Sequence, residues 1–417
     1  MNEIRDLIIG IDFGKDTAQV FYYDRKAQEP RALSMKTGTN ICEVPVLLLR
    51  RGQQGDFLAG LEAESYEKEH GGELITDLYE LTGLEKKEGL PGDLAPWEYA
   101  AAFLKGILKF LGVASVPDNT KSLIITVPSL TKERVHNLRK ACESLGFANG
   151  KYALMDHEEA FYYHAMTQQK EPLSRSVGWY AFEGNQVVFR KLEIFRNRKP
   201  AMVRFGETKE TTLSPDPVMK DSEFSAWAEK TLGSELFTSI QISGNGFSQS
   251  WARESVKTLC YHRRRVYFGN NLFARGACMA GKERTEDHAL KAFRFLGKSR
   301  VMWDIGMEMR VMGSPAYYPL IESGSNWYEA QRSCELILDD KKELVFLVSL
   351  TGSGERKKAV MELPGLPVRP NRTTRLLVEL GCLDPEKCCV TVTDLGFGEM
   401  FPSSGRVWKE IIGPMEV

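Results

Sequence analysis

Hydrophobic positions in the first 300 residues follow two different periods. Short apolar runs of strand length occur at 7–11, at 18–23 and in SLIITVP (122–128), and stretches with apolar residues at helical spacing occur at 97–112 and 131–145. The second helix is expected to begin after Pro128, with Thr131 as its first polar residue, and to end before Gly146. This order of strands and helices predicts an α/β domain.

The pattern continues as mixed strands and helices up to about residue 298. We expect a hairpin around Glu183-Gly184-Asn185 and a loop with one strand at 196–222. The further expected elements are helices at 156–168, 222–232, 248–260 and 284–297, and strands at 177–182, 186–195 and 236–243. From about residue 299 the alternation has a period of two, as in ELVFLVSL and CCVTVTD, which predicts an all-β domain at 299–417 after an α/β domain at 1–298.

Composition and charge narrow the class of protein. Lys and Arg number 55 against 56 Asp and Glu, so the net charge of -1 predicts no general attraction to nucleic acid. The eight cysteines are scattered without CxxC pairs, and we expect them to be reduced thiols in a cytoplasmic protein. The N-terminal apolar run is interrupted at Gly10 and Asp12, so neither a signal peptide nor a membrane span is expected.

A family resemblance rests on several segments that occur in order. IGIDFGKDT (9–17) resembles the first phosphate loop of the actin-like ATPase superfamily, most closely that of the seventy-kilodalton heat-shock (DnaK-like) chaperones. The segments that resemble later parts of the same family are VPSLTKERVHNLRKACESLGF (127–147), MDHEEAFYYHA (155–165), IQISGNGFSQSWARESVKTL (240–259), NNLFARGACMAG (270–281) and the strand-rich 361–398.

The resemblance implies an architecture. It is an actin-like (ribonuclease-H-like), two-lobed nucleotide-binding-type domain, with lobe I at about 1–175 and lobe II at about 176–298, followed by a β-sandwich that resembles the peptide-binding domain. The second lobe is expected to be reduced, because a short segment stands where the family has a subdomain that helps to clamp the adenine. Since the chain ends at Val417, no helical lid is expected over the sandwich.

The resemblance also implies a residual nucleotide site. In the first loop, Asp12, Gly14, Lys15 and Thr17 take the positions next to the phosphates. Gly184 is the one glycine kept in the second loop, and Gly244 and Gly246 belong to the segment on the adenosine side. We assign no catalytic residue and no metal ligand, and ATP or ADP with Mg²⁺ is expected to bind weakly if it binds.

Several positions depart from the family pattern. Lys15 and Asp16 replace two hydroxyl residues, Ala181 stands where the second loop has its metal-side aspartate, and His157 stands where a helix begins with glutamate. The segment ITDLYELTG (75–83) has Tyr79 nearest to the position of an expected lysine. These changes predict a degenerate member of the family in which hydrolysis is lost.

We therefore expect a chaperone-like, non-catalytic pseudo-ATPase that binds peptide or protein partners, and leave open whether any enzymatic activity remains. Two alternatives are a nucleotide-responsive heat-shock-70-like chaperone with weak ATP binding and slow hydrolysis, and an actin-like structural or assembly protein. For the peptide site we expect rims at Gly324-Ser325-Asn326 and at 351–354. The oligomeric state stays open.

One basic run needs a separate interpretation. His262-Arg263-Arg264-Arg265 lies between Tyr261 and Tyr267, a pattern that fits either contact with an anion or nucleic acid, or a solvated edge between a helix and a strand. We favour the solvated edge, and expect no nucleic-acid and no membrane partner.

Overall fold

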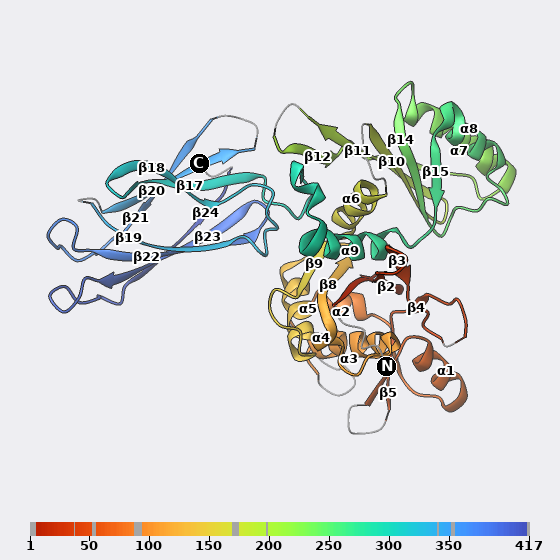
Figure 1. Ribbon diagram of the computed structural model, residues 1–417, viewed down its shortest axis with the longest axis horizontal. Helices are drawn as coiled ribbons and strands as arrows, with labels where there is room; N and C mark the ends of the chain where they lie inside the picture. Colours follow the sequence, from red (N-terminus) through yellow and green to blue (C-terminus); the bar gives the residue numbers. More distant parts are fainter. Residues whose placement is uncertain are drawn as a thin grey trace. The chain divides into compact units, whose positions relative to one another are not determined.

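The computed structural model describes residues 6–36, 38–51, 56–86, 94–168, 175–196, 199–339, 342–351 and 355–414. The chain divides into two compact units, Met1–Gly297 and Lys298–Val417 (Figure 1). This division lies one residue before the domain boundary predicted from the sequence. No helix among the described residues is long and apolar enough to cross a membrane.

The first unit contains both helices and strands. Its strands are β1 (Leu7–Phe13), β2 (Thr17–Asp24), β3 (Glu29–Ala32), β4 (Glu43–Pro45), β5 (Leu48–Arg51), β6 (Asp56–Ala59), β7 (Leu74–Ile75), β8 (Thr120–Val127), β9 (Tyr152–Asp156), β10 (Ser176–Glu183), β11 (Gln186–Phe195), β12 (Ala201–Phe205), β13 (Lys209–Thr212), β14 (Phe237–Gly244), β15 (Arg265–Phe268) and β16 (Phe293–Phe295). Its α-helices are α1 (Leu61–His70), α2 (Leu78–Thr82), α3 (Pro96–Leu108), α4 (Val116–Asn119), α5 (Lys132–Ser144), α6 (His157–Thr167), α7 (Pro217–Leu232), α8 (Arg253–Cys260) and α9 (Leu272–Lys282). Short 3₁₀ turns η1 (Lys109–Leu111), η2 (Tyr261–Arg263) and η4 (Ala289–Ala292) and the π-helical turn η3 (Glu283–Asp287) complete it.

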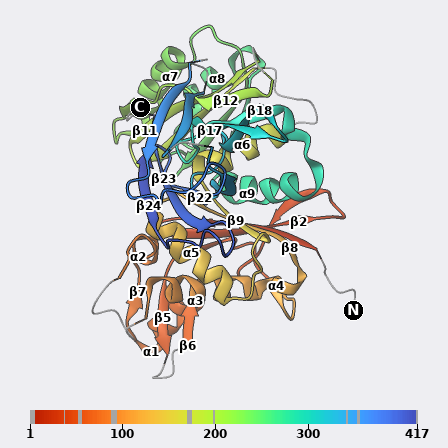
Figure 2. The same ribbon diagram turned by 90° about the vertical axis from the view of Figure 1, so that its left-hand side faces the viewer.

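Two large sheets of the first unit have the same strand order. The first sheet has the order β3-β2-β1-β8-β9, and the second has β12-β11-β10-β14-β15 with β16 added beside β12. In each sheet the first three strands in the chain pair antiparallel, a short strand that follows (β4 or β13) pairs antiparallel with the second, and two later strands run parallel to the first. The unit is therefore built from two copies of one strand arrangement. A small third sheet, β6-β5-β7, lies beside α1 (Figure 2).

Each half of this unit supplies a helix to the other half. Helix α6 follows β9 of the first sheet, but its Phe161 is buried against Trp179 of the second sheet, with ring centroids 4.8 Å apart. Helix α9 follows β15 of the second sheet, but its Cys278 packs with Ile8 and Phe21 of the first sheet. Both helices lie between the two sheets (Figure 1). Residues 157–167 and 272–282 thus pack on the sheet of the opposite predicted lobe.

Two glycines allow the close approach of α9. A Cβ atom at Gly10 in β1 would lie 2.2 Å from the backbone nitrogen of Cys278, and one at Gly276 would lie 2.0 Å from the carbonyl oxygen of Ala160 in α6. Because both neighbouring atoms belong to backbone, no side-chain rotation would relieve such a contact. The absence of side chains at these positions therefore sets the spacing between α9, β1 and α6.

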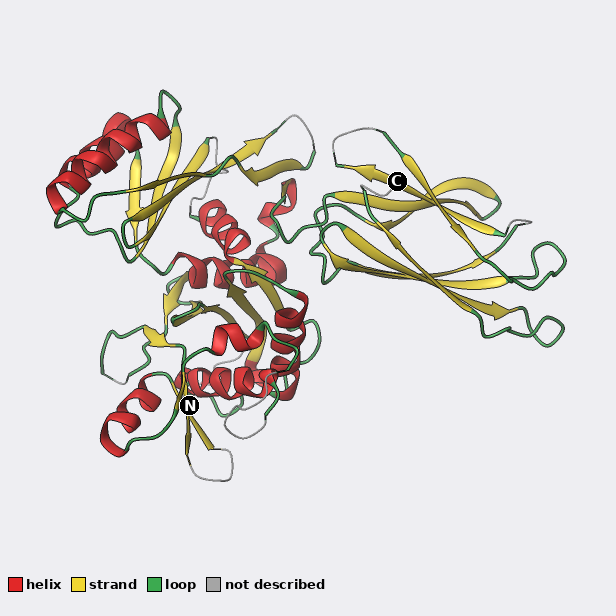
Figure 3. Ribbon diagram, turned by 180° about the vertical axis from the view of Figure 1, so that it is seen from behind, coloured by secondary structure: helices red, strands yellow, loops and turns green. Residues whose placement is uncertain are grey.

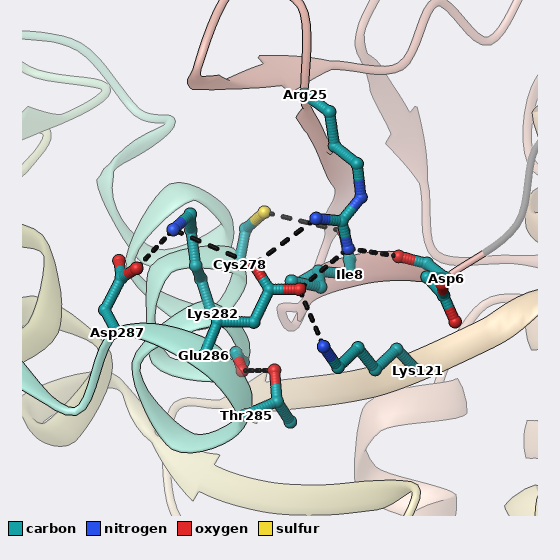
Figure 4. Close-up of polar contacts among 10 residues, drawn as sticks. Asp6, Ile8, Arg25, Lys121, Cys278, Lys282, Thr285, Glu286 and Asp287 are labelled. Atoms are coloured by element: carbon teal, nitrogen blue, oxygen red, sulfur yellow. Dashed lines mark hydrogen bonds and ion pairs between the residues drawn. The ribbon is translucent and has the colours of Figure 1, made fainter.

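An ion-pair network fixes the end of α9 to the first sheet (Figure 4). The carboxylate of Glu286 accepts hydrogen bonds from Arg25 after β2, at 2.8 Å, and from Lys121 of β8, at 2.9 Å. The hydrogen bond from Arg25 is the main cause that lowers the pKa of Glu286 to about 2. Lys282 pairs with Asp287 beside them.

The last helix lies elsewhere than predicted. Instead of 284–297, the helix is α9 at Leu272–Lys282, and β16 occupies part of the expected range. His288 has a φ of 50°, which no α-helix contains, and the chain leaves the helical conformation there. The segment 196–222 also differs, because it contains both β12 and β13 and the start of α7.

The second unit consists of two antiparallel four-stranded sheets. Its strands are β17 (Trp303–Val311), β18 (Ser314–Ile321), β19 (Gln331–Ile337), β20 (Glu343–Leu350), β21 (Lys357–Glu362), β22 (Arg375–Asp384), β23 (Lys387–Gly396) and β24 (Val407–Ile412). The orders are β18-β17-β20-β21 and β19-β22-β23-β24, and the sheets form two layers (Figure 3). The buried Asp394 of β23 accepts two hydrogen bonds from Arg369, both of 2.8 Å, which hold the pKa of its carboxyl group well below the usual range.

The cysteines differ from the expectation in one place. Cys382 and Cys388 form a disulfide between directly paired positions of β22 and β23, whereas reduced thiols were predicted throughout. The hairpin brings the two residues together, and the spacing along the chain does not reveal this pairing. The remaining cysteines are free, and burial raises the pKa of Cys142 to about 12.

Candidate functional site

Four polar side chains lie in one row across the first sheet. Asp12 of β1 is opposite Gln19 of β2 and Thr126 of β8, and Gln19 is opposite Glu43 of β4. Directly opposed residues in neighbouring strands project from the same face of a sheet. We call these four residues the polar row. It crosses a strand, β1, that is buried along its whole length.

The polar row has hydrogen-bonding capacity left over on both sides of Asp12. Gln19 uses its amide nitrogen to donate to Glu43 at 2.7 Å. The Oε1 atom of Gln19 and the Oγ1 atom of Thr126 are buried and have no hydrogen-bond partner among the described residues. An unsatisfied buried polar atom costs about 1–3 kcal/mol, so both are positions where a polar ligand atom would be stabilised.

The carboxylate of Asp12 is bonded within the protein. His157, the first residue of α6, has its Nε2 atom 2.8 Å from Oδ1 of Asp12. The imidazole ring is stacked on Phe273 of α9, with centroids 3.8 Å apart and planes 8° from parallel. Asp156 caps α6 by accepting a hydrogen bond from the backbone N–H of Glu159, which fixes where His157 begins the helix. A cation that binds Asp12 would compete with this imidazole.

The first turn uses its glycine N–H internally. The N–H of Gly14 donates to the carbonyl oxygen of Thr17 at 3.1 Å, and closes a four-residue turn between β1 and β2. A Cβ atom at Gly14 would lie 2.6 Å from that oxygen, so the turn itself requires glycine. Lys15, Asp16 and Thr17 are exposed. The turn thus uses the N–H of Gly14 within the protein and presents the side chains of Lys15, Asp16 and Thr17 to solvent.

The second turn is also occupied by protein groups. Gly184 takes a φ of 60° at the first central position of the β10–β11 hairpin, as a type II′ turn requires. Its N–H donates to Oδ1 of Asn245 at 2.9 Å. The ammonium group of Lys220 on α7 donates to Oδ1 of Asn185 at 2.9 Å and to the carbonyl oxygen of Gly184 at 3.2 Å. Burial lowers the pKa of Lys220.

Gly244 and Gly246 are explained by packing against this hairpin. A Cβ atom at Gly244 would lie 1.8 Å from the carbonyl oxygen of Phe182, and one at Gly246 would lie 1.9 Å from that of Gly184. The N–H of Gly244 donates to Oδ1 of Asn270 at 2.8 Å. The space that glycine leaves beside each Cα is therefore filled by the chain itself.

The predicted site residues form two groups. Asp12, Gly14, Lys15 and Thr17 lie on the β1–β2 hairpin, and Gly184, Gly244 and Gly246 meet beside the β10–β11 hairpin. No hydrogen bond or ion pair among the described residues joins the first group to the second. Sequence reasoning missed the side chains that complete each group, which are Gln19, Thr126, Lys220 and Asn245. Strand register would have indicated Gln19 and Thr126, because they stand opposite Asp12.

Comparison with known proteins gives two family matches. The model of the C-terminal region of a family of unknown function (DUF5716) matches residues 29–298. The chain belongs to the DUF5716 family. A domain of unknown function (DUF8552) matches residues 300–413. No curated protein matches the chain. The matched DUF5716 region contains His157, Gly184, Gly244 and Gly246, whereas Asp12 precedes it.

In this DUF5716 protein a buried tyrosine, Tyr79, lies in the segment 75–83, where the family that the sequence resembles has a lysine. Tyr79 of α2 is 4% exposed, and its hydroxyl is 3.1 Å from that of Ser129. The guanidinium group of Arg134 lies over the ring, 3.9 Å from its centroid, and donates to Ser129 and Thr82. Tyr79 therefore contributes to packing, and its ring is covered by a cation from α5.

Neither a metal cluster nor an open peptide rim is found in the described parts of the DUF5716 chain. Among those residues, no group of three or more His, Cys, Asp and Glu side chains could hold a metal ion. In the second unit, Gly324 donates its N–H to Val301, and Ser325 accepts a hydrogen bond from the N–H of Val301. The expected rim at Gly324-Ser325-Asn326 thus has main-chain groups already paired. The other rim, 351–354, lies outside the described residues apart from Thr351.

Proposed function

We propose that this protein is an actin-like, heat-shock-70-like pseudo-ATPase, which binds a peptide or protein partner and does not hydrolyse ATP. The two sheets of equal strand order and the exchange of α6 and α9 support the two-lobed actin-like architecture. The two antiparallel sheets of the second unit support the sandwich. A cytoplasmic location belongs to the proposal because six of the eight cysteines are free thiols, although the Cys382–Cys388 disulfide is of a kind more common in oxidising compartments.

One observation carries the proposal. The groups expected to hold nucleotide are bonded to the protein: Asp12 to His157, the N–H of Gly14 to Thr17, and the N–H of Gly184 to Asn245. Phosphoryl transfer needs carboxylates for Mg²⁺ and free N–H groups for phosphate oxygens. At about 1 kcal/mol for each internal hydrogen bond that must be exchanged, a nucleotide would lose about 3 kcal/mol. This corresponds to about a hundredfold weaker binding.

A second candidate function keeps some nucleotide binding. The free Oε1 atom of Gln19 and Oγ1 atom of Thr126 lie on either side of Asp12. Towards a ligand, Oε1 would accept a hydrogen bond, and the Thr126 hydroxyl would accept or donate one. This observation favours a nucleotide-responsive protein with slow hydrolysis over an assembly protein.

Calorimetric titration of the full chain with Mg·ATP and Mg·ADP separates these functions, together with an assay of phosphate release. We expect no saturable heat up to millimolar nucleotide and no phosphate release above the buffer rate. Saturable binding in the micromolar range that disappears in Asp12→Asn, but persists in the control Lys209→Ala at an exposed position away from the candidate site, would overturn the pseudo-ATPase proposal. Phosphate release that depends on Asp12 would overturn it equally.

A further inference from the structure

Strand β15 leaves one side of the second sheet open. Among the described residues β15 pairs only with β14, and it is the last strand of that sheet. The N–H of Gly269, just after β15, donates to the carbonyl oxygen of Ile242 in β14 at 3.0 Å. Because successive residues of a strand turn their backbone groups to opposite sides, those of Val266 and Phe268 point away from β14. The strand therefore offers two unpaired donors and acceptors to another extended chain.

Unpaired arginines stand at the start of this edge. Arg263 and Arg265 are exposed, and neither side chain makes a hydrogen bond or ion pair with a described residue. Arg264 donates from Nε to the carbonyl oxygen of Tyr261 at 2.9 Å, but its Nη1 atom is buried without a partner. In a chain of net charge -1, three successive arginines that form no ion pair with a described carboxylate make a local positive surface.

The backbone just before β15 is strained. His262 and Arg263 have φ values of 58° and 59°, in the left-handed region that non-glycine residues rarely adopt. Each such residue costs about 1–2 kcal/mol. A solvated loop that only connects α8 to β15 would not need these strained conformations.

Aromatic rings are exposed at the same edge. Tyr261, Tyr267 and Phe268 are 65%, 42% and 58% exposed. An edge that is protected against pairing carries charges, proline or a bulge, and avoids exposed apolar rings. The combination of rings and arginines therefore fits a contact surface better than a protected edge.

A pocket adjoins the basic segment, between the C-terminal ends of α7 and α8. Its volume is about 380 Å³, and Lys257, Tyr261, His262 and Arg264 line it together with Glu229 on the α7 side. The cationic side chains of Lys257 and Arg264 on this pocket would favour an acidic side chain of a ligand.

We infer that the edge of β15, with the basic segment 262–265, binds an extended acidic segment of a partner protein, which adds to the sheet as a further strand. Main-chain hydrogen bonds to Val266 and Phe268 would give affinity, and the arginines would select acidic side chains. Single-stranded nucleic acid would use the arginines and rings but leave the strand's backbone groups unpaired, so the peptide is favoured. The inference rests on the proposed function in one respect, that the protein binds a protein partner.

Fluorescence anisotropy on the full chain tests this inference at low salt. The probes are a labelled peptide of about ten residues with alternating Glu and Thr, a matched peptide of Gln and Thr, and an oligothymidine of about twelve nucleotides. We expect saturable binding of the Glu peptide, and binding of the Gln peptide and the oligothymidine weaker by about tenfold or more, a difference of about 1.4 kcal/mol. Tighter binding of the oligothymidine than of the Glu peptide would overturn the inference, as would the absence of Glu-peptide binding.

Two variants locate the site. Arg263→Glu with Arg265→Glu should weaken binding about tenfold or more, whereas the control Lys209→Glu with Lys230→Glu, which changes the net charge equally at exposed positions, should not. Phe268→Pro removes the N–H that points away from β14, so the hydrogen bonds between β15 and β14 are kept. Phe268→Ala removes only the ring. Phe268→Pro should bind more weakly than Phe268→Ala. Unchanged affinity in the double arginine variant would place the peptide elsewhere and overturn the inference.

These outcomes are measured without nucleotide and are therefore distinguishable from the test of the pseudo-ATPase proposal. Nucleotide binding in the micromolar range would overturn the pseudo-ATPase proposal but would not change the conclusion from the peptide experiment. Loss of the peptide result would leave the nucleotide result standing.

Discussion

The contact between His157 and Asp12 decides whether the first hairpin is available to a ligand, and it can be measured as a coupling energy. The two atoms are 2.8 Å apart, and the side chains are 19% and 12% exposed. A hydrogen bond to a charged group contributes about 1.5–3 kcal/mol to stability, and partial exposure reduces this, so we expect a coupling of about 1–2 kcal/mol.

A double-mutant cycle isolates this coupling. His157→Phe keeps a ring on Phe273 and removes Nε2, and Asp12→Ala removes the carboxylate. The free energy of unfolding of the wild type, both single variants and the double variant is measured by urea denaturation. We expect each single variant to be less stable than the wild type. The double variant should lose less than the sum, because the second substitution has no contact left to break.

Additive effects within about 0.5 kcal/mol would refute the reasoning, because Asp12 would then be energetically free to bind a cation. A control cycle on the exposed pair Lys257 and Glu254, 2.7 Å apart on α8, should give a coupling of about 0.5 kcal/mol or less. Equal couplings in the two cycles would show that burial adds nothing at Asp12.

Two further predictions concern stability. Burial lowers the pKa of His164 on α6 to about 4, so the unfolded chain, with an ordinary His pKa of 6.5, takes up the proton first as pH falls. The free energy of unfolding should therefore fall by about 2 kcal/mol between pH 7 and pH 5 because of this residue. The variant His164→Gln cannot take up that proton, so its free energy of unfolding, measured by urea denaturation, should fall by correspondingly less over the same range. Equal losses in the two proteins would contradict the lowered pKa of His164. Gly246→Ala should cost about 3 kcal/mol or more because its Cβ would meet the carbonyl oxygen of Gly184. Gly184→Ala should cost only about 1–2 kcal/mol, because its Cβ has open space and only φ is strained, and equal shifts in Tm would contradict this ranking.

Local signals in the sequence located most of the elements around the candidate site. The apolar runs at 7–11 and 18–23 became β1 and β2, and Thr131 caps α5 by accepting a hydrogen bond from the N–H of Arg134. The turn at Gly184-Asn185 follows from its residue types. These features depend on neighbours within a few residues. For α9 the prediction failed although its buried residues lie along one face of the helix, because the interior glycines Gly276 and Gly281 lower the helix propensity of the segment.

The partners of the candidate residues depend on contacts between distant segments. Asp12 and His157 are 145 residues apart in the chain, and only the packing of α6 between the sheets brings them together. The structural role of Gly244 and Gly246 cannot be predicted from the sequence for the same reason. A glycine that leaves room for phosphate and a glycine that leaves room for a neighbouring hairpin are identical in sequence, and the coordinates distinguish them through the carbonyl oxygens of Phe182 and Gly184.

One segment joins the second hairpin to the edge proposed for partner binding. Strand β14 ends at Gly244 and pairs with β15 from Ser239 to Ile242, and Asn270, two residues after β15, accepts the N–H of Gly244. A ligand that displaced Asn270 from Gly244 would therefore disturb the end of β15 directly. By linkage, nucleotide that binds at Gly244 and alters this contact must change the affinity for the acidic peptide, and the peptide must change the affinity for nucleotide by the same factor. Under the pseudo-ATPase proposal the peptide affinity is the same with and without millimolar Mg·ATP. A shift of threefold or more, an energy of about 0.6 kcal/mol, would instead identify a nucleotide-responsive protein in which Gly244 couples the two sites.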